Sequence, residues 1–338
     1  MNNIVEEKSY IDGVMKVASL DYDWNKLDNK TLLISGGTGF IGSAIIDVIK
    51  CRNECFGNDI RVISLSRHVN KSNEKNIKYM VADVTEKILV PYDVDYVLHL
   101  ASNTHPEQYA KDPVGTIETN VSGCSNLLKL AVEKHIDRFL LASSVEIYGQ
   151  CAEYPVDENY CGYIDCNTVR AGYNEAKRVC ESLVQSYKSQ YGINSVIVRL
   201  ARCFGRDNTK KDTKAMAQFL ACANSGKNIV LRSDGKQRYS YCYYLDAVSG
   251  ILKVLLDGKN GEAYNIAADD ANMSLFDIAA YIASLSKTKV IFDMKDAVDG
   301  ASKATNALLD CTKLKDIGWK PLFSIKEGLE RSLNTELK

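Results

Sequence analysis

Residues 31–42 read TLLISGGTGFIG. The run Thr31–Ser35 is almost entirely apolar, which is typical of a strand buried on both faces of a parallel sheet. Glycines follow at fixed spacing, at Gly36, Gly39 and Gly42, and the next residues are apolar at helical spacing. A strand, a glycine turn and a helix in this order form the phosphate-binding corner of a dinucleotide fold.

Each residue of this corner has a predicted task. Gly36 permits the tight turn, Gly39 lets backbone N–H groups approach a pyrophosphate, and Gly42 lets helix and strand pack closely. The helix N-terminus supplies about half a positive charge to the phosphates. We therefore expect Gly36, Gly39 and Gly42 to contact a dinucleotide, together with the remaining residues of the turn, Thr38, Phe40 and Ile41.

Composition excludes several classes of function. The 338 residues carry a net charge of −1, which gives no electrostatic reason to expect nucleic acid or an anionic membrane as a partner. No apolar run approaches the roughly 18 residues of a membrane span, and the N-terminus lacks the pattern of a secretory signal. Four histidines and 11 cysteines show no paired metal-ligand spacing. We expect a cytoplasmic protein without a metal site.

From residue 31 the pattern alternates strands and helices, which predicts right-handed βαβ crossovers and a parallel sheet covered on both faces. The predicted class is α/β, a doubly wound sheet of Rossmann type over residues 31–200. A smaller α/β lobe, interleaved with the first, is predicted over residues 201–338, and a helical extension over residues 1–30. The expected strands are 31–35, 61–65, 77–82, 94–100, 138–142 and 194–200, followed by 228–232 and 262–266 in the lobe. The expected helices are 114–134 and 173–191, followed by 213–225 and 245–256 in the lobe.

The extension contains a short amphipathic segment. Ile11, Val14, Met15, Val17 and Ala18 form an apolar stripe at helical spacing. Such a helix could pack on the core or on a neighbouring subunit, and the pattern does not decide between them.

The end of the second strand bears on the choice of cofactor. A carboxylate at this point binds the ribose 2′-hydroxyl of NAD, whereas a nearby arginine accommodates the 2′-phosphate of NADP. This chain has Ser66 and Arg67 here, with Lys71 close behind and no carboxylate. The local positive charge favours NADP over NAD, although Arg67 could also be a solvated loop residue. Asp83, after the third strand, is a candidate to contact the adenine, and the alternative is a turn or capping role.

Four polar residues in two motifs indicate a site for proton transfer. Tyr173 and Lys177 are four residues apart and therefore lie on one face of a helix. A tyrosine whose pKa is about 10 transfers protons poorly at neutral pH unless a nearby cation stabilises the phenolate. Ser144 and Glu146 follow the fifth strand, at the sheet edge where ligands of such folds bind. Ser144 would hydrogen-bond the reacting oxygen, and Glu146 is a candidate acid or base. A Tyr and Lys pair alone is more often a surface pair, so the order of the motifs carries this prediction.

The chain resembles an extended short-chain dehydrogenase/reductase of the branch that modifies nucleotide sugars. The similarity covers residues 31–321, through GGTGFIG (36–42), ADV (82–84), HLAS (99–102), TNV (119–121), SSVEIYG (143–149) and YNEAK (173–177). The resemblance implies that these motifs line the cofactor, which adds Val84, Ala101, Ser102 and Asn120 to the expected contacts, along with Tyr173 and Lys177.

Within this branch the motifs are most similar to UDP-glucuronate decarboxylases and NDP-glucose 4,6-dehydratases. In those families bound NAD oxidises the sugar at C4, and the 4-keto group then permits loss of carbon dioxide or water. The resemblance implies that Tyr173 is the base, Lys177 its electrostatic partner, Ser144 the hydroxyl-positioning group and Glu146 a second acid or base.

Three departures from these families bear on the reaction. Val145 stands where the dehydratases usually have an Asp beside the Glu. The decarboxylases carry an arginine near the last helix of the lobe, where this chain reads ATNALLD (304–310), and Arg202 replaces a common Asn after the sixth strand. The segment GKQRYSYCYYLD (235–246) resembles the part that binds the nucleotide diphosphate. Arg238 is the first candidate for that role and Arg202 the second, because guanidinium groups suit phosphate, although either could be an ordinary ion pair between the lobes.

Three hypotheses follow. The first is an enzyme that modifies a nucleotide sugar through C4 oxidation, as a decarboxylase, dehydratase or epimerase. The second, motivated by Arg67 and the missing Asp, is an NADPH-dependent reductase of a keto-sugar nucleotide. The third is a non-catalytic dinucleotide-binding sensor, which would not need Ser144, Tyr173 and Lys177 together. Helices 114–134 and 173–191 resemble the pair that forms a four-helix dimer interface in this family, so a homodimer is expected.

Overall fold

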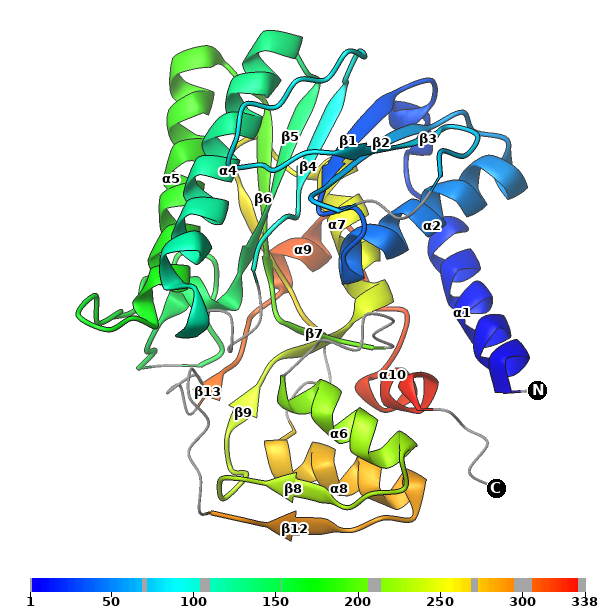
Figure 1. Cartoon of the computed structure of the whole chain (residues 1–338), viewed down its shortest axis with the longest axis vertical. Coiled ribbons are helices and arrows are strands. Elements are labelled where there is room, and N and C mark those ends of the chain that lie inside the picture. Colours follow the sequence, from blue (N-terminus) through cyan, green and yellow to red (C-terminus); the bar gives the residue numbers. More distant parts are fainter. Residues whose placement is uncertain are drawn as a thin grey trace.

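The computed structural model describes residues 2–68, 72–103, 110–152, 154–205, 214–268, 273–294 and 306–333, with residues 2–7 described by their backbone alone. Within these ranges no helix is long and apolar enough to cross a membrane. The predicted α/β fold is confirmed, and Figure 1 shows its two parts, a large sheet flanked by helices and a smaller lobe below it.

The large part is built on a seven-stranded sheet in which every neighbouring pair is parallel. Its order is β11-β6-β5-β4-β1-β2-β3. The strand order reverses between β1 and β4, and in open sheets this switch point is where ligands bind, beyond the carboxyl ends of the strands. The strands are β1 (Thr31–Ser35), β2 (Arg61–Ser66), β3 (Ile77–Val81), β4 (Tyr96–His99), β5 (Arg138–Ser144), β6 (Ser195–Leu200) and β11 (Ala263–Ile266).

Helices cover both faces of this sheet. The helices α4 (Pro113–Lys134) and α5 (Ala171–Tyr191) lie side by side on one face, and α2 (Phe40–Phe56) and α7 (Tyr244–Asp257) lie on the other (Figure 1). In β1, Leu33 packs into the core beneath α4 and α5, whereas its neighbours in the strand pack into the core with α2 and α7. Burial on both faces explains the continuous apolar run of β1.

The N-terminal extension packs on its own chain. Helix α1 (Asn2–Ala18) contacts α2 and α7, and Val14 and Val17 are buried there. The predicted stripe was wrong at Ile11, which is 55% exposed. The short 3-10 helix η1 (Trp24–Leu27) then leads into β1.

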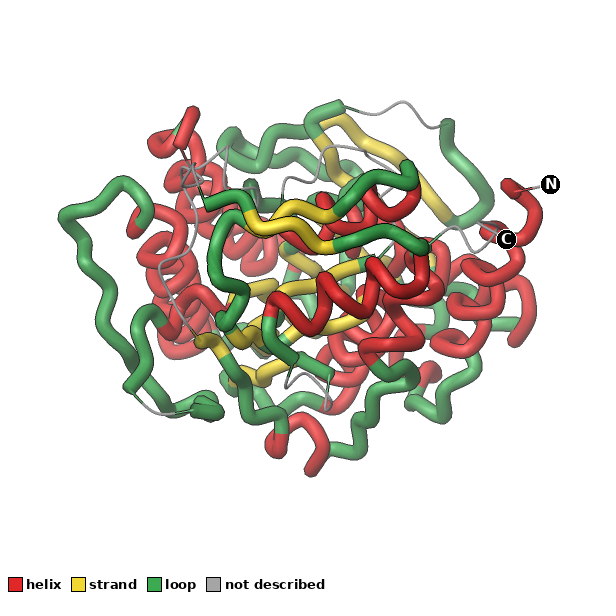
Figure 2. The backbone as a smooth tube through the Cα atoms, turned by 90° about the horizontal axis from the view of Figure 1, so that it is seen from below, coloured by secondary structure: helices red, strands yellow, loops and turns green. Residues whose placement is uncertain are grey.

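The lobe is made of short elements. Its strands form the parallel pairs β7–β10, β8–β12 and β9–β13, and α6 packs on α8. Figure 2 views the molecule from the side of this lobe. The strands are β7 (Arg202–Phe204), β8 (Ile229–Leu231), β9 (Arg238–Tyr239), β10 (Tyr241–Tyr243), β12 (Val290–Phe292) and β13 (Asn306–Ala307). The helices are α6 (Ala215–Asn224), α8 (Leu275–Ser286), α9 (Thr312–Asp316) and α10 (Ile325–Ser332).

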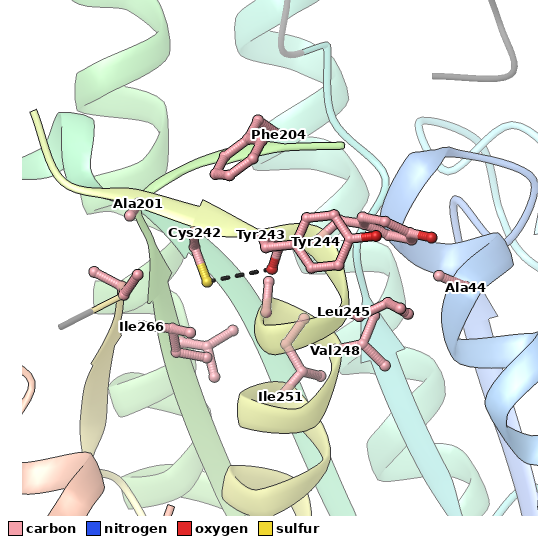
Figure 3. Packing of buried hydrophobic residues seen from close by; sticks show 14 of the residues in the cluster. Ala44, Ala201, Phe204, Cys242, Tyr243, Tyr244, Leu245, Val248, Ile251 and Ile266 are labelled. Carbon is pink, nitrogen blue, oxygen red and sulfur yellow. Dashed lines mark hydrogen bonds between the residues drawn. The ribbon is translucent and has the colours of Figure 1, made fainter. Parts of the chain in front are cut away.

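Two elements expected in the lobe are part of the large sheet or pack against it. Strand β11 pairs with β6 at the sheet edge, and α7 packs beneath the sheet. Of the 14 residues of α7, 12 are buried, and a helix that is apolar around most of its circumference must lie inside a protein. Figure 3 shows this junction, where the rings of Phe204 and Tyr243 lie 5.8 Å apart above Leu245 and Val248 of α7. The junction therefore joins the lobe firmly to the sheet.

Candidate active site

The glycine turn lies at the switch point of the sheet. Gly36 has a φ of +74°, which favours glycine, and its N–H donates to the carbonyl of Leu65 at 2.9 Å. A Cβ on Gly42 would lie 2.3 Å from the carbonyl oxygen of Gly36, so glycine is required where α2 starts this close to the turn. The first N–H groups of α2 have no acceptor inside the helix and suit a phosphate.

A cavity of about 440 Å³ opens beyond the carboxyl ends of the strands, beside this turn. Its volume lies in the ordinary range for small-molecule and cofactor sites. The structure brings to this cavity all but two of the residues predicted for the site. Those that line it are Gly36, Thr38, Gly39, Phe40, Ile41, Gly42, Ser66, Arg67, Asp83, Val84, Ala101, Ser102, Ser144, Glu146, Tyr173, Lys177 and Arg202.

The end of β2 holds the groups expected to read the ribose. Thr38 Oγ1 donates to Ser66 Oγ at 2.8 Å, and Arg67 is exposed at the cavity rim. Asp83 Oδ1 accepts hydrogen bonds from the backbone N–H and hydroxyl of Thr85. These bonds, the backbone one above all, lower the pKa of Asp83, and Arg67 adds to the effect. Asp83 therefore has the turn role that was its alternative while still lining the cavity. Lys71 lies outside the described residues.

Tyr173 and Lys177 lie on the buried face of α5. Tyr173 is 5% exposed and Lys177 3% exposed, so they are not a surface pair. The ammonium nitrogen of Lys177 lies 5.9 Å from the centre of the Tyr173 ring and donates to the carbonyl of Ala142 at 2.8 Å. A fixed cation is thus held next to a phenol at the cavity wall.

Ser144, at the end of β5, and Glu146, just after it, line the same cavity. Ser144 caps the 3-10 helix η2 (Val145–Tyr148), its hydroxyl accepting from the N–H of Glu146 at 3.3 Å. The carboxylate of Glu146 forms two ion pairs, with Arg170 at 2.8 Å and with Arg202 at 3.3 Å. Glu146 is therefore held in place by arginines from two other segments of the chain.

Several buried side-chain atoms have no hydrogen-bond partner in the described part of the chain, and two of them bear on the cavity. The hydroxyl of Ser143 is one, and Ser143 lines the cavity while being 4% exposed. A polar group of a ligand would satisfy this hydroxyl, which fits a dinucleotide lying along the glycine turn. The other is Nε2 of His99, whose Nδ1 is hydrogen-bonded to Ser35 at 2.8 Å. Burial, reinforced by the charge of Lys177, lowers the pKa of His99 to about 3, so its ring is neutral at neutral pH.

Two predicted contacts lie outside the set of residues that line the cavity. Asn120 is buried in α4 and accepts from the hydroxyl of Ser102 at 2.9 Å, so it supports a lining residue. Arg238 is exposed on β9 in the lobe. Its predicted phosphate role is not tested by this geometry.

The cavity is also lined by Arg170, Ser143 and Lys214, which were not predicted as site residues. Arg170 stands three residues before Tyr173, and this spacing alone would have placed the two on one side of α5. Lys214 gave no such signal, because the fold of the lobe brings it to the cavity.

Comparison with a family model gives one match over most of the sheet. Residues 32–267 match the model described as the NAD dependent epimerase/dehydratase family. The matched range contains the glycine turn, Ser144, Tyr173 and Lys177.

Curated relatives are similar over nearly the whole chain. UDP-glucuronic acid decarboxylase 5 of Arabidopsis thaliana is 31% identical over 312 residues, covering 89% of this chain and 87% of the relative. UDP-glucuronic acid decarboxylase 1 of Danio rerio is 29% identical over 315 residues, covering 90% and 72%.

Solved structures share the fold. The UDP-glucose 4-epimerase of Thermotoga maritima, solved with UDP-glucose, has a TM-score of 0.79 at 22% identity, covering 90% of this chain and 98% of that chain. The dTDP-glucose 4,6-dehydratase of Streptomyces venezuelae, solved with NAD bound, has a TM-score of 0.74 at 22% identity, covering 89% and 95%. At 22% identity, the similarity to these two structures shows a shared fold and nothing more.

Proposed function

Because this chain belongs to the NAD dependent epimerase/dehydratase family, we propose that it modifies a nucleotide sugar through oxidation at C4. We propose further that the overall reaction is a decarboxylation, as in the relatives that are 31% identical. The observation that carries the proposal is the buried pair of Tyr173 and Lys177, which lines the cavity together with Ser144. A phenol, a fixed cation and a hydroxyl are the groups that removal of a proton from a sugar alcohol requires.

The residues take the following roles. Lys177, fixed by the Ala142 carbonyl, stabilises Tyr173 as a phenolate, and this phenolate takes the proton of the C4 hydroxyl and becomes a phenol. The Ser144 hydroxyl donates to the reacting oxygen of the sugar. Once C4 is a ketone, the bond between C5 and a C6 carboxylate breaks, carbon dioxide leaves, and the electron pair passes into the enolate that the ketone stabilises. A proton from solvent would then be added at C5, and Tyr173 would return its proton to the C4 oxygen as the hydride returns to that carbon, so that the cofactor is unchanged overall.

The cofactor would be held along the glycine turn. The N-terminus of α2 would take the pyrophosphate, Ser66 and Arg67 the adenosine ribose, and Ser143 a polar group of the nicotinamide end. The dinucleotide supplies an acceptor for the hydride of C4. NAD is the cofactor of the family, and Arg67 supports a proposal that NADP is also accepted.

Charge in the cavity suits an anionic substrate. Among the described residues that line the cavity, five are basic (Arg67, Arg170, Lys177, Arg202 and Lys214) and two are acidic (Asp83 and Glu146). This excess of positive charge occurs in a chain whose net charge is −1, and it supports a nucleotide diphosphate as the ligand. Arg238, from the lobe, is proposed as a further phosphate ligand.

Dehydration is the less favoured reaction. Loss of water from C5 and C6 needs a base at C5 and an acid for the departing hydroxyl. Val145, buried beside Glu146, supplies neither. Among the described residues that line the cavity, the only other carboxylate is Asp83, beyond the end of β3.

The test is incubation with a panel of nucleotide sugars, with product mass and the absorbance of reduced nicotinamide followed together. The panel contains UDP-glucuronate, UDP-glucose, dTDP-glucose and GDP-mannose. A product lighter by carbon dioxide supports decarboxylation. Loss of water, or an unchanged mass with a changed sugar, would replace decarboxylation by dehydration or epimerisation, and no conversion would contradict the proposal.

A second candidate is an NADPH-dependent reductase of a keto-sugar nucleotide. It is favoured by Arg67 at the cavity rim, beside a Ser66 that offers no carboxylate to a ribose hydroxyl. The two candidates differ in how the cofactor is used. Consumption of NADPH in proportion to product supports the reductase, whereas turnover without net change in the cofactor supports the C4-oxidation mechanism.

We also propose a homodimer formed through α4 and α5. Both helices expose apolar side chains, with Val114 65% and Ile117 and Val179 each 42% exposed. Sedimentation at micromolar concentration tests this, and a monomer would contradict it.

A further inference from the structure

Arg202 lines the cavity and is held in a fixed orientation. It begins β7, and its backbone N–H donates to the carbonyl of Ser240 at 3.2 Å. Its guanidinium carbon lies 4.0 Å from the centre of the buried Tyr239 ring. Stacking on an aromatic face leaves the edge of the guanidinium plane for planar anions, with which it can form two parallel hydrogen bonds.

The two arginines hold Glu146 unequally. The bond from Arg170 measures 2.8 Å, and Arg170 also donates to the side-chain oxygen of Asn174 at 2.6 Å. The bond from Arg202 measures 3.3 Å, whereas charge-assisted bonds of this kind are typically about 2.7–2.9 Å long. The contact with Arg202 is therefore the looser one, and an incoming anion can take it while Arg170 keeps Glu146 in place.

The position of Arg202 limits which anion this is. Glu146, its partner, lies two residues from Ser144 in the wall of the cavity that also contains Tyr173. An anion that replaces Glu146 on Arg202 must therefore sit beside the part of the sugar that reacts. The diphosphate is attached at C1, across the ring from C4, whereas a carboxylate at C6 is attached to C5, next to C4.

We propose that Arg202 binds the carboxylate of the sugar and selects nucleotide-linked uronic acids over neutral sugars. This inference rests on the proposed function. In the ligand-free protein the carboxylate of Glu146 occupies the place of the sugar carboxylate. The inference moves Arg202 from the diphosphate, its role in the sequence-based prediction, to the sugar, and leaves the diphosphate to other groups.

Binding measured by calorimetry, without turnover, tests this assignment. The ligands are UDP, UDP-glucose and UDP-glucuronate, with GDP-mannose and GDP-mannuronate as a second matched pair. The variants are Arg202→Gln, Arg202→Lys and the control Arg232→Gln, which removes the same charge from an exposed position outside the cavity lining. Circular dichroism establishes that each variant is folded.

The unmodified protein is expected to bind the uronate of at least one pair more tightly than its neutral partner. Arg202→Gln should weaken binding of that uronate by about 10- to 100-fold, the usual effect of losing a hydrogen bond between charged groups. The same variant should change the dissociation constants of the neutral sugar and of the free nucleotide by less than about twofold. Arg202→Lys should restore part of the lost affinity for the uronate, and Arg232→Gln should leave all the dissociation constants unchanged.

Each other outcome is decisive. An equal loss for uronate, neutral sugar and UDP would place Arg202 on the diphosphate and overturn the inference. An unchanged preference in Arg202→Gln would leave Arg202 as a structural partner of Glu146 alone and also overturn it. Failure of the unmodified protein to bind any of these ligands would instead contradict the proposed function.

Discussion

Lys177 and Tyr173 lie one turn apart on the buried face of α5, with the Lys177 ammonium nitrogen 5.9 Å from the centre of the Tyr173 ring. The bond from Lys177 to the carbonyl of Ala142 connects this helix to the end of β5, where Ser144 stands. The relative position of the cation, the phenol and the hydroxyl is therefore fixed by the packing of α5 on the sheet.

Removing the phenol should abolish the proton transfer and spare binding. Tyr173→Phe keeps the ring and its packing, so we expect the rate of turnover to fall by about 10²- to 10⁴-fold, the usual contribution of a general base. The dissociation constant for the nucleotide sugar should change by less than about twofold. Tyr187→Phe, on the same helix but outside the cavity lining, serves as the control. A Tyr173→Phe variant with full turnover would overturn the assignment.

Removing the carboxylate of Glu146 should lower stability. Glu146→Gln removes the carboxylate that forms ion pairs with Arg170 and Arg202, both partly buried. We expect the free energy of unfolding in urea to fall by about 1–3 kcal/mol. As a control, Asp234→Asn breaks an ion pair with Lys236 that is mostly exposed, and it should change the free energy of unfolding by less than about 0.5 kcal/mol. Equal effects of the two variants would show that the ion pairs of Glu146 contribute no more stability than an exposed ion pair does.

His99 should make the protein less stable in mild acid. Burial lowers its pKa to about 3 from an ordinary value of 6.5, so between these values the unfolded chain binds a proton that the folded protein does not. Stability contributed by the neutral ring is complete above pH ~6.5 and is lost as the pH falls, by about 2 kcal/mol on going from pH ~7.5 to pH ~5.

Urea unfolding at the two pH values measures this loss. His99→Gln should lose less stability than the unmodified protein over this interval, by about 2 kcal/mol. His68→Gln, which replaces an exposed histidine, should behave as the unmodified protein does. Identical pH dependence in all three proteins would show that His99 does not remain neutral in the fold.

The glycine turn should not tolerate a methyl group. In Gly42→Ala the new Cβ would lie 2.3 Å from a backbone oxygen of the turn, so α2 or the turn must move. We expect the affinity for the dinucleotide to fall by about tenfold or more, since roughly 1.4 kcal/mol of misplaced phosphate contacts suffices for that change. Ser43→Ala, the adjacent helical position, should bind normally. Normal binding by Gly42→Ala would place the cofactor elsewhere.

Most of the fold could be predicted because its signals are local. The apolar run of β1, the glycine spacing and the periodicity of α5 each lie within about 20 residues of sequence, and the structure has all three where they were expected. The place of β11 was not predictable in this way. A short strand pairs according to its contacts with distant segments, and β11 reaches β6 only because the buried helix α7 carries the chain back beneath the sheet.

The candidate site also has features that the sequence predicts and features that depend on distant segments of the chain. Tyr173 and Lys177 share a helix, and Ser144 follows a recognisable strand, so their meeting could be expected. The ion pairs of Glu146 with Arg170 and Arg202 join three separate segments, and spacing along the chain says nothing about such a contact. The phosphate role of Arg238 stays a prediction, because it rests on a motif and the structure places this residue, exposed, on β9 in the lobe.

The most direct test of a C4 oxidation at this cavity is a single-turnover measurement of reduced nicotinamide. The protein loaded with NAD is mixed rapidly with each nucleotide sugar of the panel, and the absorbance of the reduced cofactor is followed. A transient rise with at least one sugar, UDP-glucuronate first among them, and its absence in Tyr173→Phe, is the predicted result. No rise with any sugar, or an equal rise in Tyr173→Phe, would contradict the oxidation of a nucleotide sugar by this site.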